Sequence, residues 1–248
     1  MSALYDYVLN LADNTLVLGQ RLSQWCGVGP FLEEDLALVN TSLDVFGQAR
    51  MLLQLAAELK GSGTADDLAF LRDQHEFKNV LLVEQLNGDY AHTMMRQYMI
   101  DVYHVHLYTA LSQSSHEQLA AIAEKSLKEV KYHLQRSELW IKRMALGTEE
   151  SLSRLQEALN NLWHYHHELF EKNEEMEVLI QQNIAANPED LHEKWLLETE
   201  ALISTTPLKI PQSGWHATGG RIGHHSEYLG LMLCEMQFLQ RAYPNCEW

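Results

Sequence analysis

A short segment in the middle of a long helical pattern has the spacing of a metal-binding helix but lacks one of its ligands. Di-iron sites in helical bundles use a Glu three residues before a His on each of two helices, and one further Glu from each of the other two. Residues at i and i+3 share a helix face, so both side chains reach the same metal. His133 is present, but the residue three positions before it is Val130, which cannot bind a metal. Glu129 lies four positions before His133 and would serve only with an altered helical phase.

A second segment repeats this pattern. Val45 and Gln48 are three positions apart among apolar residues of helical spacing, where a di-iron helix would have Glu and His. They precede Val130 and His133 by 85 positions each. In this second segment neither position has the Glu or His that would bind a metal. The equal spacing of the two segments indicates a pseudo-repeat.

Asn14 and Asp101, which are 87 positions apart, extend the pseudo-repeat. Asn14 interrupts an apolar face, and Asp101 lies one turn from Tyr98 and Val105 in an apolar stripe. Asp101 is a candidate metal ligand or general base, but a paired position in a polar network is favoured because a lone buried carboxylate is costly. Two helical hairpins of matching register predict a four-helix bundle, joined by a crossover through residues 61–88.

Helical periodicity and chain-breaking residues indicate a mostly helical chain. The expected helices of the bundle cover residues 4–25, about 32–59, about 89–113 and about 115–146, with Ser115 opening the fourth and a short capped helix over 64–71. Further helices are expected over about 151–172, 188–204 and 225–242, with a weaker amphipathic stretch over 174–185. The fold class is therefore all-α, a ferritin-like four-helix bundle with additional C-terminal helices. We expect a single domain over 1–248, with a core bundle over about 4–147 and additional packed helices over about 151–242.

Composition limits the classes of partner. The chain is 46% hydrophobic and 21% charged, as soluble globular proteins are. Its net charge of −16 argues against nucleic acid or an anionic membrane as the main partner. We expect a cytoplasmic protein, because no apolar run approaches the length of a membrane span and the N-terminus lacks a signal core. Cys26, Cys234 and Cys246 have no metal-binding spacing and indicate reduced thiols.

One histidine-rich segment is a further candidate for metal binding. It contains His164, His166, His167 and Glu168. His164 and Glu168 share a helix face, but no second matching helix supplies the remaining carboxylates. An exposed polar face is therefore favoured over a metal site.

Three other features have a structural and a functional interpretation. His133 and Glu129 are either a metal pair or, as we favour, a hydrogen-bonded structural pair. His224 and His225 open a helix, and capping or a surface contact is favoured over metal binding. Residues 219–223 have the glycines of a phosphate loop, but no strand precedes them, so a structural turn is favoured. Nothing resembles a Ser-His-Asp or Cys-His nucleophile arrangement.

Six segments together carry a resemblance that covers nearly the whole chain. They are residues 13–26, 43–50, 81–89, 96–101, 128–134 and 223–241. In these segments the chain resembles the non-catalytic, ferritin-like C subunits of bacterial phenylacetyl-CoA epoxidases, which are multicomponent aromatic-ring oxygenases of aerobic phenylacetate degradation.

The resemblance implies a division of labour. In such systems the A subunit has the di-iron site and binds the CoA thioester, and the C subunit shares its fold, pairs with it and holds it in an active, soluble assembly. The system is completed by a reductase with flavin and an iron–sulfur cluster, and by a small accessory subunit. The assembly adds one oxygen atom of O₂ to the ring of phenylacetyl-CoA, giving the 1,2-epoxide, with NADPH as reductant. For this chain, the resemblance implies no cofactor of its own, and it allows a homodimer when the chain is alone.

Measured against a working di-iron pattern, four of six positions have lost their ligand. The six are Asn14, Val45, Gln48, Asp101, Val130 and His133. Only Asp101 and His133 are able to bind a metal, which is too few for a carboxylate-bridged iron pair. We therefore expect no catalytic, cofactor-binding or metal-binding residues, and predict a polar structural core at these positions with Glu129 as a neighbour.

These observations leave one favoured hypothesis and two alternatives. The favoured one is a structural, non-catalytic subunit that stabilises the di-iron A subunit. The first alternative is an oxygenase with shifted ligands, namely Glu129, His133, Asp101 and Glu33 or Glu34. The second is a helical homo-oligomeric binding protein. Iron content separates the favoured hypothesis from the first alternative, and co-purification with a homologue of the di-iron A subunit separates it from the second.

Overall fold

The computed structural model describes residues 2–212, 214–244 and 246. Within these ranges the chain forms ten α-helices, three 3₁₀ helices and no strand, so the all-α class is confirmed. The chain has two compact units, and each is described by itself. Unit 1 comprises Met1–Leu86 and Thr218–Trp248, and unit 2 comprises Asn87–Ala217. A single domain over the whole chain stays a prediction.

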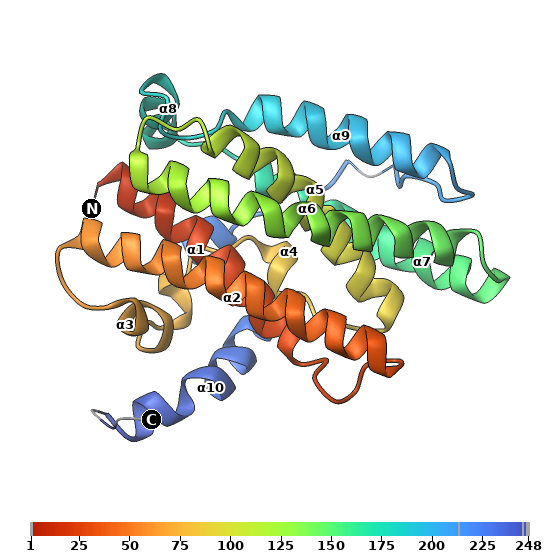
Figure 1. Ribbon diagram of the computed structural model, residues 1–248, viewed down its shortest axis with the longest axis horizontal. Helices are drawn as coiled ribbons and strands as arrows, with labels where there is room; N and C mark the ends of the chain where they lie inside the picture. The colour runs from red at the N-terminus through yellow and green to blue at the C-terminus, as the bar shows by residue number, and fades with distance from the viewer. Residues whose placement is uncertain (1, 213, 245, 247–248) are drawn as a thin grey trace. The chain divides into compact units, whose positions relative to one another are not determined.

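Each unit is built on one long helical hairpin. The elements of unit 1 are α1 (Ala3–Ser23), α2 (Leu32–Lys60), α3 (Ala65–Phe70), η1 (Gln74–Glu76), α4 (Leu81–Glu84), η3 (Gly220–Ile222) and α10 (Glu227–Ala242). Those of unit 2 are α5 (Tyr90–Leu111), α6 (Glu117–Ala145), α7 (Glu149–Leu162), η2 (Trp163–Phe170), α8 (Glu174–Gln181) and α9 (Pro188–Ser204). In unit 1, α1 packs along α2, and α10 packs on α3 and η1; in unit 2, α5 packs along α6 and also contacts α7 and α9 (Figure 1).

Local signals set several helix ends where the sequence predicts them. Gly61 ends α2 with a φ of 73°, a left-handed conformation that favours glycine. Thr64 and Asp67 form the capping box expected for the short helix α3. Gly88, at the end of the predicted crossover, has a φ of 59°, which is also a left-handed conformation. Residues 219–223 form a turn around η3, which confirms their structural interpretation.

Two boundaries within the predicted connections differ from expectation. The cap of α6 is His116, whose Nδ1 accepts from the backbone N–H of Leu119 at 3.3 Å. The predicted cap Ser115 instead donates its hydroxyl to the carbonyl of Gln182 at 2.8 Å, a contact that local sequence does not reveal. The crossover over residues 61–88, in which one short helix over 64–71 is predicted, also contains the 3₁₀ turn η1 and the helical turn α4.

The helix predicted over 151–172 is wrong in its second half. The α-helix α7 ends at Leu162, and residues 163–170 continue as the 3₁₀ helix η2. Six of these eight residues are aromatic or histidine, which are weak α-helix formers. The ring of His166 also hydrogen-bonds the carbonyl of Trp163, three residues before it. Tertiary packing of these rings, rather than helical periodicity, therefore shapes the segment.

A buried ion pair ties α1 to the connection that follows α3. The guanidinium of Arg72 donates to both carboxylate oxygens of Asp13, and Asp13 is fully buried. Asp13 also accepts from the backbone N–H of Lys78 at 2.8 Å. Arg72 lies over the ring of Phe77 at 4.1 Å, a cation–π contact. A buried charge pair of this kind is stable only when its remaining polar groups are satisfied, as they are here.

A second buried carboxylate, Glu84 of α4, joins the two sequence parts of unit 1. It accepts from Asn79 Nδ2 at 3.0 Å, from His225 Nδ1 at 2.9 Å and from the backbone N–H of Ser226 at 2.6 Å. The carbonyl of Glu84 accepts from the guanidinium of Arg21, which also donates to the carbonyl of Tyr228. The residues leading into α10 are therefore fixed to α1 and α4.

His225 is not the capping or surface residue that the sequence predicts. Its side chain is fully buried, with Nδ1 on Glu84 and Nε2 at 3.0 Å from the carbonyl of Phe77. Both ring nitrogens face acceptors, so both donate and the imidazole is protonated. Burial by itself lowers the pKa of His225, but the hydrogen bonds to Glu84 and Phe77 raise it overall.

We predict that His225→Gln destabilises the chain, and most strongly in acid. Because the pKa of His225 is raised by folding, its contribution is complete below the unfolded value near 6.5 and is lost as pH rises through the folded value. Breaking a buried pair costs on the order of 3 kcal/mol, so the melting temperature at pH 6 should fall by about 5–10 °C. The difference from wild type should shrink as the pH rises above 6.5 and through the raised pKa of His225. His224→Gln, at the exposed neighbouring position, is the matched control; equal effects of the two variants would contradict the prediction.

Candidate functional site

The three predicted positions in unit 1 are buried but offer no strong metal ligand. Asn14 lies on α1, and Val45 and Gln48 lie on α2. The carbonyl oxygen of the Asn14 side chain accepts from the backbone N–H of Val80 at 2.8 Å. Its Nδ2 is buried and has no hydrogen-bond partner among the described residues. Two neutral amides and one isopropyl group therefore stand where carboxylates and an imidazole would be required.

In unit 2, the corresponding positions surround one buried carboxylate. Asp101 on α5 is fully buried and accepts from Gln97 Nε2 at 2.6 Å through one oxygen. Its other oxygen accepts from Ser137 Oγ of α6 at 2.7 Å. Gln97 lies one turn before Asp101 on α5, whereas Ser137 lies on α6. The carboxylate therefore joins the two helices of the hairpin.

Burial and the neighbouring imidazole shift the pKa of Asp101 in opposite directions. Desolvation raises it, whereas His133, Ser137 and Gln97 lower it, and the result is a pKa raised to about 6. His104, also on α5, has its pKa lowered to about 3 by burial and by His133. His104 is therefore neutral at physiological pH, and Asp101 is a carboxylate that protonates near pH 6.

The remaining predicted positions, Val130 and His133, lie on α6. Val130 is fully buried and has no donor atom, and His133 is 2% exposed. Glu129 is half-buried, and its pairing with His133 stays a prediction. One carboxylate held by two protein donors and one imidazole do not fit the Glu and Glu-x-x-His set of a carboxylate-bridged iron pair.

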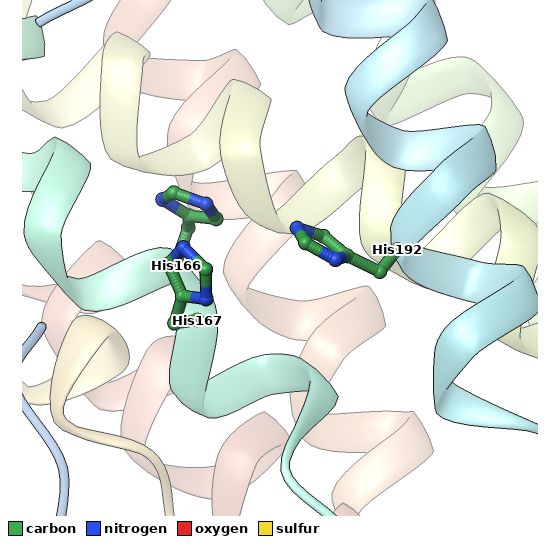
Figure 2. Close-up of side chains that lie close together, drawn as sticks. All are labelled: His166, His167 and His192. Atoms are coloured by element: carbon green, nitrogen blue, oxygen red, sulfur yellow. The ribbon is translucent and has the colours of Figure 1, made fainter. Parts of the chain in front are cut away.

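The histidine-rich segment is not the exposed polar face that the sequence favours. His166 and Glu168 of η2 are buried, and His164 and His167 are half-buried. Figure 2 shows His192 of α9 directed towards the adjacent pair His166 and His167. One ligating atom from each of these three histidines lies within 4.8 Å of the others. The sequence missed this group because its third member comes from a helix 25 residues further along the chain.

Aromatic rings hold this group of histidines in place. His166 stacks on Trp195 of α9 with ring centroids 4.9 Å apart and an angle of 9°. Trp195 is fully buried and donates its indole N–H to the carbonyl of Met99 on α5 at 2.8 Å. His216 lies with its ring centroid 3.4 Å from that of His167. The backbone N–H of Ala217 donates to the carbonyl of His164 and fixes the loop that carries His216.

Comparison with known proteins places the chain in a family. A family model described as phenylacetic acid catabolic protein matches residues 1–248. The chain belongs to this family. A curated relative, the C subunit of the 1,2-phenylacetyl-CoA epoxidase of Escherichia coli (strain K12), is 49% identical over 248 residues, which is 100% of both chains.

Membership of the phenylacetic acid catabolic proteins confirms the resemblance and the all-α, ferritin-like class expected from the sequence. Two of the segments that carry the resemblance supply the buried pair Glu84 and His225. Another supplies Asp13, and a fourth supplies both Gln97 and Asp101. No helix in the described part of this family member is long and apolar enough to cross a membrane.

We predict that Asp101→Asn stabilises the chain at neutral pH. Because folding raises the pKa of Asp101 from 3.8 to about 6, its contribution is complete below the lower value and is lost as pH rises through the higher one. Asparagine has no ionised form, so the variant does not lose this stability at higher pH. Its side-chain oxygen still accepts a hydrogen bond from Gln97. As the pH rises from about 4 to 7, the free energy of unfolding of the variant should increase relative to that of wild type by about 3 kcal/mol. This corresponds to roughly 5–10 °C in melting temperature.

The comparison must be made between variant and wild type rather than along one pH profile. The lowered pKa of His104 makes the chain less stable as the pH falls below 6.5. Over the same pH range, Asp101 has the opposite effect on stability. The effect of His104 is present in both chains and cancels. Asp190→Asn, at an exposed position of unit 2, is the control. A lower melting temperature for Asp101→Asn at neutral pH would mean that the ionised carboxylate stabilises the fold.

Proposed function

We propose that the chain is a structural, non-catalytic subunit of a multicomponent phenylacetyl-CoA 1,2-epoxidase. In this proposal it pairs with the catalytic di-iron A subunit, which it keeps in an active, soluble assembly in the cytoplasm. The reductase, with its flavin, iron–sulfur cluster and NADPH, is a further component of the same system, as is the small accessory subunit. Identity of 49% over the full length to the C subunit of the Escherichia coli epoxidase supports the assignment to this system.

The observation that carries the non-catalytic role is the chemistry of the six former ligand positions. In unit 1 they supply two amides and Val45, and in unit 2 they supply Val130, His133 and Asp101. Both carboxylate oxygens of Asp101 accept hydrogen bonds, one from Gln97 and one from Ser137. The cofactor of the reaction is accordingly proposed to reside in the catalytic partner and not in this chain.

The same polar groups have a structural role in the proposal. Asp101 links α5 to α6 through Ser137, and the imidazole of His133 favours its charged form. The hydrogen bonds of Asp101 form only when Gln97 and Ser137 are correctly placed, so the network selects one arrangement of the hairpin. In this way the positions that hold a metal in a catalytic relative hold the hairpin together in this chain.

Surface properties agree with a soluble subunit in a reducing compartment. The net charge is −16, and Cys26, Cys234 and Cys246 are exposed free thiols. Exposed free thiols are typical of proteins that remain in the reducing cytoplasm.

We predict that the chain purified alone after growth in abundant iron contains almost no iron. Co-expressed with the di-iron A subunit of the same system, it should co-purify with that protein, and all the iron of the complex should belong to the catalytic partner. Mass spectrometry of metals and size-exclusion chromatography measure both. About two irons per isolated chain, lost in His133→Ala, would instead identify an oxygenase with shifted ligands. A stable homo-oligomer that never binds the di-iron partner would favour the helical binding protein.

We also predict that His133→Leu weakens the fold without removing a chemical step. The substitution deprives Asp101 of the imidazole that favours its charged form, and an uncompensated buried polar group costs about 1–3 kcal/mol. The melting temperature should fall by several degrees, while the epoxidation rate per assembled complex stays that of the wild type. Tyr132→Leu, at a position 61% exposed, is the matched control. An unchanged melting temperature with a lost rate would contradict the structural role.

A further inference from the structure

Three histidines of unit 2 have the arrangement of a metal site that is separate from the former di-iron positions. His166 and His167 are consecutive residues of η2, and His192 lies in the first turns of α9 (Figure 2). Their ligating atoms all lie within 4.8 Å of one another. A tetrahedral zinc ion with bonds of about 2.0–2.1 Å holds its ligand atoms about 3.3 Å apart. Small side-chain rotations would therefore close the three imidazoles around one ion.

One of the three rings is already oriented as a metal ligand. The Nδ1–H of His166 donates to the carbonyl of Trp163 at 2.5 Å, which leaves Nε2 with a free lone pair. Metal-binding histidines almost always make such a bond with the second nitrogen, because it fixes the tautomer and the ring. Stacking on Trp195 limits rotation of the same ring further.

Two other ring nitrogens of this cluster are buried without a partner. His192 Nε2 and His216 Nδ1 have no hydrogen bond among the described residues. A buried polar atom without a partner costs about 1–3 kcal/mol, and native structures contain few of them. Packing alone explains the stacked ring of His166, but it does not explain why buried nitrogens of His192 and His216 remain unsatisfied. A bound cation would satisfy the nitrogen of His192 directly.

The protonation state of the cluster also suits a cation. Burial lowers the pKa of His166 to about 3, and burial together with the neighbouring histidines lowers the pKa values of His167 and His192. All three rings are therefore neutral at physiological pH, which is the form that binds metals.

We propose that His166, His167 and His192 bind one divalent transition-metal ion, zinc in the cell, with the fourth coordination position open beside His216. A set of neutral imidazoles suits zinc, copper and nickel, whereas magnesium and calcium require oxygen ligands. The ion joins η2 to α9 within unit 2. This site is mononuclear and lacks carboxylates, so it is distinct from an iron pair, and the proposed structural role does not depend on it.

The test is a zinc titration of the full-length chain by calorimetry at about pH 7.5, where neutral imidazoles are free to bind, after removal of metals with a chelator. Cys26, Cys234 and Cys246 are replaced by serine so that the exposed thiols do not bind zinc. One zinc per chain should bind with micromolar or tighter affinity, and it should raise the melting temperature because it binds only the folded state. No binding, or binding without a rise in melting temperature, would overturn the site.

Variants locate the ion. His192→Ala and, separately, His167→Ala should each weaken zinc binding at least about tenfold. Loss of a residue that only hydrogen-bonds a metal ligand already weakens binding by that factor. His106→Ala is the matched control, because His106 contacts Glu198 of α9 at 2.7 Å and its loss perturbs the same helix without removing a ligand. Circular dichroism checks that each variant is folded. Equal zinc affinity in His192→Ala and wild type would contradict the proposal.

Discussion

Glu84 is a carboxylate with no access to solvent, and unit 1 depends on satisfying it. A buried charge without partners would be far more costly than the whole stability of a domain allows. Its partners come from the connection after α3 and from the segment before α10, so the N-terminal hairpin and the C-terminal helix must assemble together. Protonated His225 neutralises the charge, and Arg21 binds the backbone carbonyls of Glu84 and Tyr228. Asp13 and Arg72 form a second buried ion pair in unit 1, which joins α1 to the connection after α3.

In unit 2 the comparable buried carboxylate is Asp101, which is also shielded from solvent. A di-iron site satisfies buried carboxylates with cations. Here Gln97 and Ser137 each donate a hydrogen bond to one oxygen of Asp101, and Val130 of α6 is fully buried. The helices α5 and α6 are therefore joined at Asp101 by hydrogen bonds from one side chain of each helix.

The helices were predictable from local sequence patterns. The prediction errors lie where residues far apart in the chain contact one another. Periodicity and glycine predicted the ends of α2 and the existence of all the long helices, because both act within a few residues. Ser115 was expected to cap α6, but its hydroxyl binds Gln182 instead. The expected helix over 151–172 changes to η2 because its rings pack on α9. The buried His225 looked like a surface residue, since its partner Glu84 is 141 positions away.

The sequence alone determined the all-α class and the lack of a metal-binding side chain at Val45 and Val130, since these depend on residue identity and on spacing within a helix. Family resemblance, carried by the same segments, determined the system to which the chain relates. Only the tertiary structure decided which polar groups meet: Glu84 with His225, and His166 and His167 with His192. The physical reason is that such contacts join residues whose separation in the chain follows no period, so packing creates them and local sequence carries no sign of them.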